Sequence, residues 1–206
     1  MWRPRESGPA ALIVYSHASG GHPRQSSFLC EHLAAHGYLV AAVAHQNTGP
    51  LEERIAARVP EIRAAIDEAT RSYPVDPARV GLVGWSFGGW AALATPEQDD
   101  RVSSIVALAP AGARDPLPGI IRAPLTFAWR RPVATLFLAA AEDQFIPLAH
   151  VRDVFDRAPE PKQLFVLEGA DHSHFADDVP ATGPSAAQAH EFTKAHALAH
   201  FDATLR

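Results

Sequence analysis

The clearest indication of the fold is the sequence Val80-Gly-Leu-Val-Gly84-Trp-Ser86-Phe-Gly88-Gly-Trp90. Its first half, Val80–Trp85, is a short apolar run typical of a buried strand, and Trp90–Thr95 predicts a helix. The pattern Gly-x-Ser-x-Gly joins the two, with Ser86 at its centre, and indicates a nucleophile elbow. Glycines suit this turn because side chains there would collide with the strand and the helix. A five-residue match can arise by chance, but its context favours a reactive serine on an α/β fold.

The rest of the chain repeats this alternation of apolar strand and amphipathic helix. Further strands are predicted at Ala10–His17, Tyr38–His45, Val102–Ala109, Val133–Ala141 and Gln163–Glu168. Their apolar runs are continuous, as in parallel strands covered on both faces. Further helices are predicted at Ser27–His36, Glu52–Arg71, Leu148–Arg157 and Ala186–Leu205. We therefore predict one domain over residues 1–206, with a doubly wound, mostly parallel sheet of about six strands flanked by helices.

Two segments interrupt the alternation. Pro60 lies inside a predicted helix and should kink it or begin a second one. The proline-rich segment 110–132 lies between two predicted strands and is too short for a domain. It predicts either a small cap over a site or a long crossover loop.

Composition narrows the class of protein. The chain has 206 residues, of which 47% are hydrophobic and 20% charged, as in an ordinary globular domain. Its formal net charge of −5 leaves no basic surplus for nucleic acid, and no apolar run approaches the roughly 20 residues that span a membrane. The start of the chain lacks the apolar stretch of a signal peptide. The single cysteine, Cys30, excludes an internal disulfide, so we expect a cytoplasmic protein.

A serine nucleophile needs a base, because its hydroxyl reacts poorly until an imidazole takes the proton. The chain has 11 histidines, so position decides among them. His172 directly follows the last predicted strand, at the carboxyl edge of the sheet where ligands bind in open α/β folds. Ser86 ends its own strand at the same edge. His172 is therefore the predicted base, and His174 is its rival.

The base in turn needs an acid that holds its tautomer and stabilises the imidazolium. Asp143 follows the strand Val133–Ala141, again at the carboxyl edge. Asp143 can also cap the predicted helix Leu148–Arg157, and the same carboxylate can serve both as cap and as catalytic acid. Glu142 and Asp171 are weaker candidates for the acid.

An oxyanion hole needs two backbone N–H groups. Phe87, the residue after the serine, is predicted to supply one of them. The loop Ser16–His22 contains two glycines that allow a close backbone approach to a ligand, and Ser19 is predicted to supply the second N–H. The alternative is an ordinary glycine-rich turn.

Residues beside these motifs are predicted to line a substrate pocket: Ala18, His22, Trp85, Phe145, Ile146, His174 and Phe175. Trp90 and Cys30 are expected in the core, and His196 and His200 on a solvated helix face. Several of the histidines could together hold a metal ion, but a serine elbow has no need of one. We therefore predict no metal and no other cofactor.

Five stretches carry a wider pattern: Tyr15–Ser27, Asp76–Gly84, Gly84–Gly89, Glu142–Pro147 and His172–Phe175. They resemble the oxyanion loop, the approach to the elbow, the elbow, the acid loop and the terminal His-x-x-Phe of α/β-hydrolases. The resemblance is to the dienelactone-hydrolase-like branch, and also to platelet-activating-factor acetylhydrolases and bacterial polyester hydrolases. It covers about Ala10 to Phe201 and implies the α/β-hydrolase fold.

Three departures from that family pattern stand out. Position 86 is serine, whereas dienelactone hydrolases proper use cysteine, which favours general ester hydrolysis over lactone specialisation. The oxyanion loop reads His17-Ala18 where the family usually has His-Gly. About ten residues precede the first predicted strand, whereas the family fold usually begins with two antiparallel strands, so we expect a sheet reduced to six strands. Tyr38–His45 should then be an exposed edge, unless a partner or the N-terminus covers it.

The resemblance implies a serine esterase that cleaves small carboxylic esters through an acyl-enzyme. The exposed edge strand is compatible with either a monomer or a homodimer. Ser86 would attack, His172 would carry the proton and Asp143 would orient His172. Two alternatives stay open. One is a different transfer on the same residues, such as acyl transfer, perhydrolysis or thioester cleavage. The other is a hydrolase fold that binds a ligand without catalysis.

Overall fold

Six parallel strands form the centre of the protein. The computed structural model describes residues 1–4, 8–177 and 183–206. The strands lie in the order β2-β1-β3-β4-β5-β6, and each pair of neighbours is parallel. Their bounds are β1 Ala10–Ser16, β2 Leu39–Ala42, β3 Val75–Trp85, β4 Val102–Leu108, β5 Ala134–Ala140 and β6 Lys162–Leu167. This arrangement confirms the predicted parallel α/β sheet.

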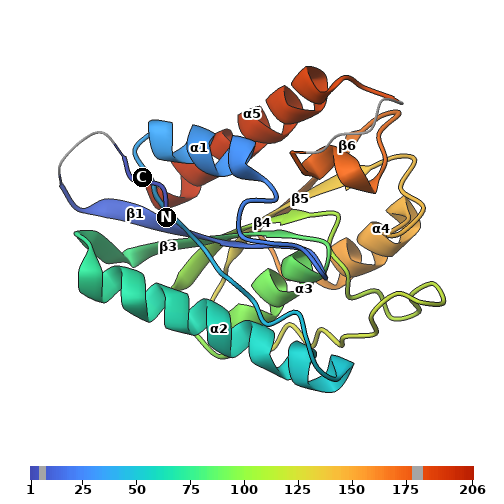
Figure 1. Ribbon diagram of the computed structural model, residues 1–206, viewed down its shortest axis with the longest axis horizontal. Helices are drawn as coiled ribbons and strands as arrows, with labels where there is room; N and C mark the ends of the chain where they lie inside the picture. The colour runs from blue at the N-terminus through green and yellow to red at the C-terminus, as the bar shows by residue number, and fades with distance from the viewer. Residues whose placement is uncertain (5–7, 178–182) are drawn as a thin grey trace.

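Helices cover both faces of this sheet (Figure 1). One face carries α1 (Ser27–Ala35) and α5 (Ala186–Leu205). The other carries α2 (Leu51–Ser72), α3 (Phe87–Ala94) and α4 (Leu148–Arg157). Two short 3₁₀ turns, Thr95–Glu97 and His172–Phe175, follow α3 and β6.

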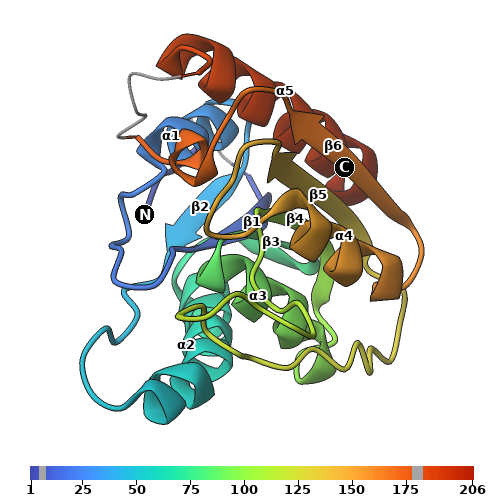
Figure 2. The same cartoon turned by 90° about the vertical axis from the view of Figure 1, so that its right-hand side faces the viewer.

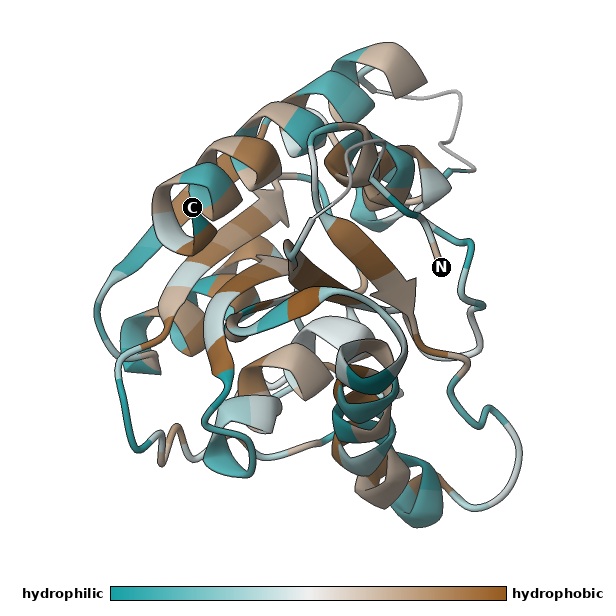
Figure 3. Ribbon diagram, turned by 90° about the vertical axis from the view of Figure 1, so that its left-hand side faces the viewer, coloured by the Kyte–Doolittle hydropathy of each residue, from teal (hydrophilic) through white to brown (hydrophobic). Residues whose placement is uncertain are grey.

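The sheet separates the core into two buried clusters, one under each helix layer. Successive side chains of β1 alternate between them, because neighbouring residues of a strand point to opposite faces. Leu12 packs in the cluster of α2, α3 and α4, and Ile13 packs in the cluster of α1 and α5. Both faces of the sheet are covered by apolar side chains, which explains why the apolar runs in the strand sequences are continuous. Figure 3 shows hydrophobic residues along the strands and a mixture of hydrophilic and hydrophobic residues along the helices.

The N-terminus covers part of the β2 edge. Trp2 N–H donates to the Val40 carbonyl at 2.8 Å, and Val40 N–H donates to the Trp2 carbonyl at 3.0 Å. The two residues form an isolated antiparallel bridge. The sequence leaves open whether a partner or the N-terminus covers this edge. In the structure, the N-terminal residue Trp2 pairs with it.

Two predicted elements differ in detail. α2 continues as one helix through Pro60, so no second helix begins there. Proline removes one backbone donor, but Val59 and Ile62 bury their side chains on either side of it and hold the helix to the sheet. β2 ends at Ala42, before the predicted limit, because His45 turns inward and bonds to other side chains.

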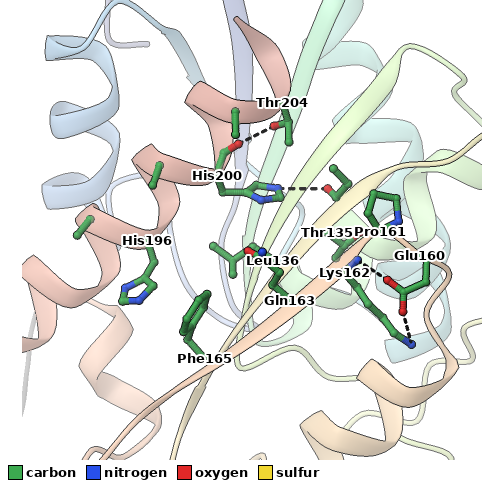
Figure 4. Close-up of a pocket in the computed structure, with 14 residues that line it drawn as sticks. Thr135, Leu136, Glu160, Pro161, Lys162, Gln163, Phe165, His196, His200 and Thr204 are labelled. Carbon is green, nitrogen blue, oxygen red and sulfur yellow. Dashed lines mark hydrogen bonds and ion pairs between the residues drawn. The ribbon is translucent and has the colours of Figure 1, made fainter.

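α5 and the β5–β6 edge enclose a cavity of about 530 Å³ (Figure 4). His196 faces Phe165 across it, with ring centroids 4.4 Å apart. His200 Nε2 lies 3.2 Å from the Ala134 carbonyl oxygen. This helix face is therefore half-buried, and the prediction of a solvated face was wrong.

Candidate active site

Ser86 sits at a strained turn between β3 and α3. Its φ of 57° and ψ of −117° are unusual for a residue with a side chain. The turn is held by hydrogen bonds from Ser86 N–H to the Leu108 carbonyl at 2.9 Å and from Ala111 N–H to the Ser86 carbonyl at 3.0 Å. The end of the neighbouring strand thus fixes a backbone conformation that Ser86 would not adopt alone.

Close backbone contacts explain the glycines around this serine. A Cβ atom on Gly84 would lie 2.2 Å from the Gly88 carbonyl oxygen, and one on Gly88 would lie 2.0 Å from the Ser16 carbonyl oxygen. No side chain fits at such distances. The second contact also brings the end of β1, and so the loop that follows it, against the start of α3.

Asp143 and His172 form a hydrogen-bonded pair. His172 Nδ1–H donates to Asp143 Oδ2 at 2.6 Å. Asp143 is only 3% exposed, and its Oδ1 accepts from Phe145 N–H at 2.8 Å and Ile146 N–H at 2.7 Å. The two amides fix the carboxylate just before α4, so Asp143 both holds the turn before the helix and orients the imidazole.

Ser86 and His172 line one cavity of about 290 Å³. Its other lining residues are Ala18, Ser19, Gln25, Trp85, Phe87, Ala111, Gly119, Ile120, Ile121, Phe145 and Ile146. Two aromatic rings flank the imidazole, with the Trp85 and Phe145 centroids 5.3 and 5.7 Å from that of His172. The fold therefore brings most of the predicted site residues together in an apolar pocket.

Part of this wall was not assigned to the site from the sequence. The segment between β4 and β5 forms no helix or strand over residues 110–132, and it passes in front of α3 (Figure 2). Gly119, Ile120 and Ile121 from this segment reach the cavity. In the sequence, only the suggestion that 110–132 forms a cap indicated that these three residues could reach the site. Gln25 also lines the cavity, and nothing in the sequence indicated it.

The two predicted oxyanion donors also lie on this cavity. Phe87 is the first residue of α3, so its N–H has no acceptor within the helix. The N–H of Ser19 makes no hydrogen bond within the described parts of the chain. Both amides are thus free to donate to a bound ligand.

Three residues predicted to line the pocket lie elsewhere. His22 is exposed, and its Nδ1 accepts from Arg24 N–H. Phe175 is fully buried in the cluster of α1 and α5. His174 is 1% exposed and turned into the protein, where its Nδ1 accepts from Asp171 N–H at 2.9 Å. None of the three is on the Ser86 cavity, so we remove them from the predicted pocket. The turn after β6 sends the side chains of His174 and Phe175 inward, whereas His22, in the loop after β1, is exposed.

His174 is therefore expected to matter for stability and not for turnover. Together with Asp171 it forms a capping box for the turn that carries His172. We expect His174→Ala to lower the free energy of unfolding by about 1–3 kcal/mol, through loss of the cap and of a buried ring. kcat should stay within about threefold of wild type. Thermal unfolding and steady-state kinetics check both values. His172→Ala is the matched comparison, and equal losses of kcat in the two variants would contradict the assignment.

The larger cavity beside α5 contains none of these groups. Its charged residues, Glu160 and Lys162, lie 4.0 Å apart and face each other at its rim. Within the described ranges, no three His, Cys, Asp or Glu side chains lie close enough together to hold a metal ion. The Ser86 cavity is therefore the candidate active site.

Comparison with known proteins shows the family of this chain. A model of the dienelactone hydrolase family matches residues 1–204. The chain belongs to the dienelactone hydrolase family. Similar proteins include Cutinase est2 of Thermobifida alba, 25% identical over 87% of this chain and 57% of that protein. Cutinase cut1 of Thermobifida fusca is 26% identical over 87% of this chain and 54% of its own length.

A further relative of this dienelactone hydrolase family member is Quorum-quenching protein AidA of Acinetobacter baumannii (strain MDR-ZJ06). It is 29% identical over 53% of this chain and 38% of its own length. The chain thus spans about half the length of the two cutinases and 38% of the length of AidA. No helix in the ranges that the structure describes is both long and apolar enough to cross a lipid bilayer.

Proposed function

We propose that this protein hydrolyses small carboxylic esters through an acyl-enzyme on Ser86. The observation that carries the proposal is the His172–Asp143 hydrogen bond of 2.6 Å on the cavity that contains the strained serine turn. A buried carboxylate that orients an imidazole beside a serine is the arrangement that activates a hydroxyl for acyl transfer. Membership of the dienelactone hydrolase family and likeness to proteins named cutinases support cleavage of an ester or lactone bond.

The reaction would run in two halves. In the first, Ser86 Oγ attacks the ester carbonyl carbon while His172 Nε2 accepts the hydroxyl proton. The N–H groups of Phe87 and Ser19 would hold the resulting oxyanion. The tetrahedral intermediate then collapses, and the leaving alcohol takes the proton from His172. In the second half, His172 deprotonates a water molecule that attacks the acyl carbon, and the carboxylic acid leaves as Ser86 regains its proton.

The cavity supports a small substrate. Its volume of about 290 Å³ lies at the lower end of ligand pockets, which hold roughly 300–1,000 Å³. Ile120 and Ile121 close one side of the cavity, and Trp85 and Phe145 flank the imidazole. This apolar lining favours an acyl chain of a few carbons without charge.

Turnover of p-nitrophenyl esters tests the proposal. We expect kcat/KM for the acetate and butyrate to exceed that for the octanoate by about tenfold or more. Each methylene contributes about 0.8 kcal/mol of binding free energy only if the cavity can bury it, and the octanoyl chain is too long for this cavity. Covalent labelling by a fluorophosphonate is the second measurement, and peptide mass spectrometry locates the label. A folded protein that neither turns over an ester nor takes up the probe would contradict ester hydrolysis and favour a ligand-binding role.

A further inference from the structure

One positive charge is buried directly behind the loop that carries Ser19. Arg58 of α2 is 0% exposed. Its Nη1 donates to the His17 carbonyl at 2.7 Å, and its Nη2 lies 3.3 Å from the Ala18 carbonyl oxygen. Within the described residues it pairs with no carboxylate at ion-pair distance. Burying an unpaired charge is unfavourable by several kcal/mol, so this arginine calls for an explanation beyond packing.

The contacts of Arg58 fix the peptide that bears the predicted oxyanion donor. The Ala18 carbonyl and the Ser19 N–H belong to one trans peptide unit, so they point in opposite directions. The Ala18 oxygen also accepts from His17 Nδ1 at 2.8 Å and from Gly21 N–H at 3.2 Å. Three donors on the carbonyl side thus hold the peptide plane and leave the Ser19 N–H directed away from Arg58.

The same guanidinium contacts the other half of the predicted oxyanion hole. Its central carbon lies 4.7 Å from the centroid of the Phe87 ring, in cation–π geometry. Phe87 is predicted to supply the other N–H of the oxyanion hole. One buried side chain of α2 therefore touches both segments that would bind the oxyanion, although it lies outside the cavity itself.

Two guanidinium groups reach this loop. Arg54 Nη2 donates to the Ser19 hydroxyl at 2.7 Å, whereas Arg58 contacts the backbone carbonyls of the loop. Burial lowers the pKa of His17 to about 4, so its imidazole is neutral at pH 7. His45 lies between the Ser16 hydroxyl, at 2.8 Å, and the Glu61 carboxylate, at 2.5 Å. In its neutral form it donates to Glu61 and accepts from Ser16. Burial lowers the pKa of Arg58 to about 10, which still leaves it charged at neutral pH.

We propose that Arg58 is a positioning residue for the oxyanion hole, which holds the Ala18–Ser19 peptide and Phe87 in place and polarises the Ser19 N–H toward developing negative charge. A cation on the carbonyl side of a peptide draws electron density away from its N–H, which strengthens that donor. The benefit is realised only when negative charge forms, so it should raise kcat rather than tighten substrate binding. The inference rests on the proposed function, because it assigns Arg58 to that reaction.

The test compares Arg58→Met with Arg58→Lys. Methionine is unbranched and apolar but cannot donate, and lysine keeps the charge but lacks the guanidinium fork. We expect Arg58→Met to lower kcat for p-nitrophenyl butyrate by about 10²-fold, within the range for one oxyanion donor, with KM changed less than threefold. Binding of butylboronic acid, whose adduct with Ser86 is tetrahedral and anionic, should weaken by a similar factor. Arg58→Lys should recover part of both losses.

Arg63→Met is the matched control. Arg63 lies on the same helix, its side chain is 44% exposed and it faces Asp99 at 3.8 Å, so kcat and boronate binding should stay at wild-type values. If Arg58→Met fails to fold, Arg58→Lys decides, with an expected loss of about tenfold in kcat and in boronate affinity at constant KM. Loss of thermal stability with unchanged kcat in either variant would overturn the proposal. Full activity of Ser86→Ala would instead overturn the proposed function.

Discussion

Replacement of Ser86 by alanine is expected to lower kcat/KM for p-nitrophenyl butyrate by about 10⁴-fold or more. The variant lacks the only atom that would form the acyl-enzyme. Alanine keeps the Cβ and meets the same backbone strain at φ 57°, and the hydrogen bonds of the turn come from backbone atoms. Thermal stability should therefore stay close to that of wild type. Any residual rate would come from the oxyanion donors and from binding.

Steady-state kinetics and fluorophosphonate labelling check this result together. Wild type should acquire one label on Ser86, and the variant should acquire none. Ser173→Ala is the control, because Ser173 lies in the turn beside His172 but does not reach the cavity. Its activity and labelling should match those of wild type. Undiminished hydrolysis by a folded Ser86→Ala variant would rule out the serine mechanism.

Asp143→Asn is expected to lower kcat by about 10³–10⁴-fold while the protein stays folded. Asparagine keeps the shape of the side chain, and its oxygen can still accept from the N–H groups of Phe145 and Ile146. Its amide nitrogen then faces His172 Nδ1 in place of Oδ2. Two donors cannot share that contact, so the imidazole is forced to carry its proton on Nε2. In that tautomer it cannot accept the proton of Ser86.

The pH dependence separates this effect from simple unfolding. Hydroxide can replace the missing base, so the rate of Asp143→Asn should keep rising at alkaline pH where that of wild type has levelled off. Asp171→Asn is the control, because the Asp171 carboxylate caps the turn of His172 by accepting from Ser173 N–H, whereas the His172 ring bonds to Asp143. It should keep kcat within about threefold. Greater loss in Asp171→Asn than in Asp143→Asn would show that the wrong carboxylate was assigned.

The residues around Ser86 were predictable because their signals are local. Val80–Trp85 is an apolar run that predicts a buried strand. The glycines beside Ser86 indicate a tight turn, because no side chain fits at Gly84 or Gly88. Asp143 and His172 each follow a strand, and parallel strands all end at the same edge of the sheet. Chain order and strand ends were therefore enough to bring these residues to one side of the molecule.

The sequence could not decide between His172 and His174. They are two residues apart in one 3₁₀ turn, and both are flanked by polar and aromatic residues. The turn directs His172 to Asp143, which lies 29 positions earlier in the chain, and sends His174 inward to cap its own loop. The direction of each side chain depends on the packing of this turn against α5 and on the distant carboxylate of Asp143, which no local pattern encodes.

The alternation of strands and helices, the parallel sheet and the serine turn could be predicted from the amino-acid sequence, since each depends on the chemistry of a few neighbouring residues. Which side chains meet depends on the folding of distant segments onto one another. Arg58 stands among charged residues of a helix and gave no sign of burial, yet it contacts the His17 carbonyl 41 positions earlier. Ile120 and Ile121 reach the cavity because a loop without regular structure folds back across α3. Such contacts form when segments far apart in the sequence pack together. The free energy of that packing comes from many core residues at once, so no local pattern predicts it.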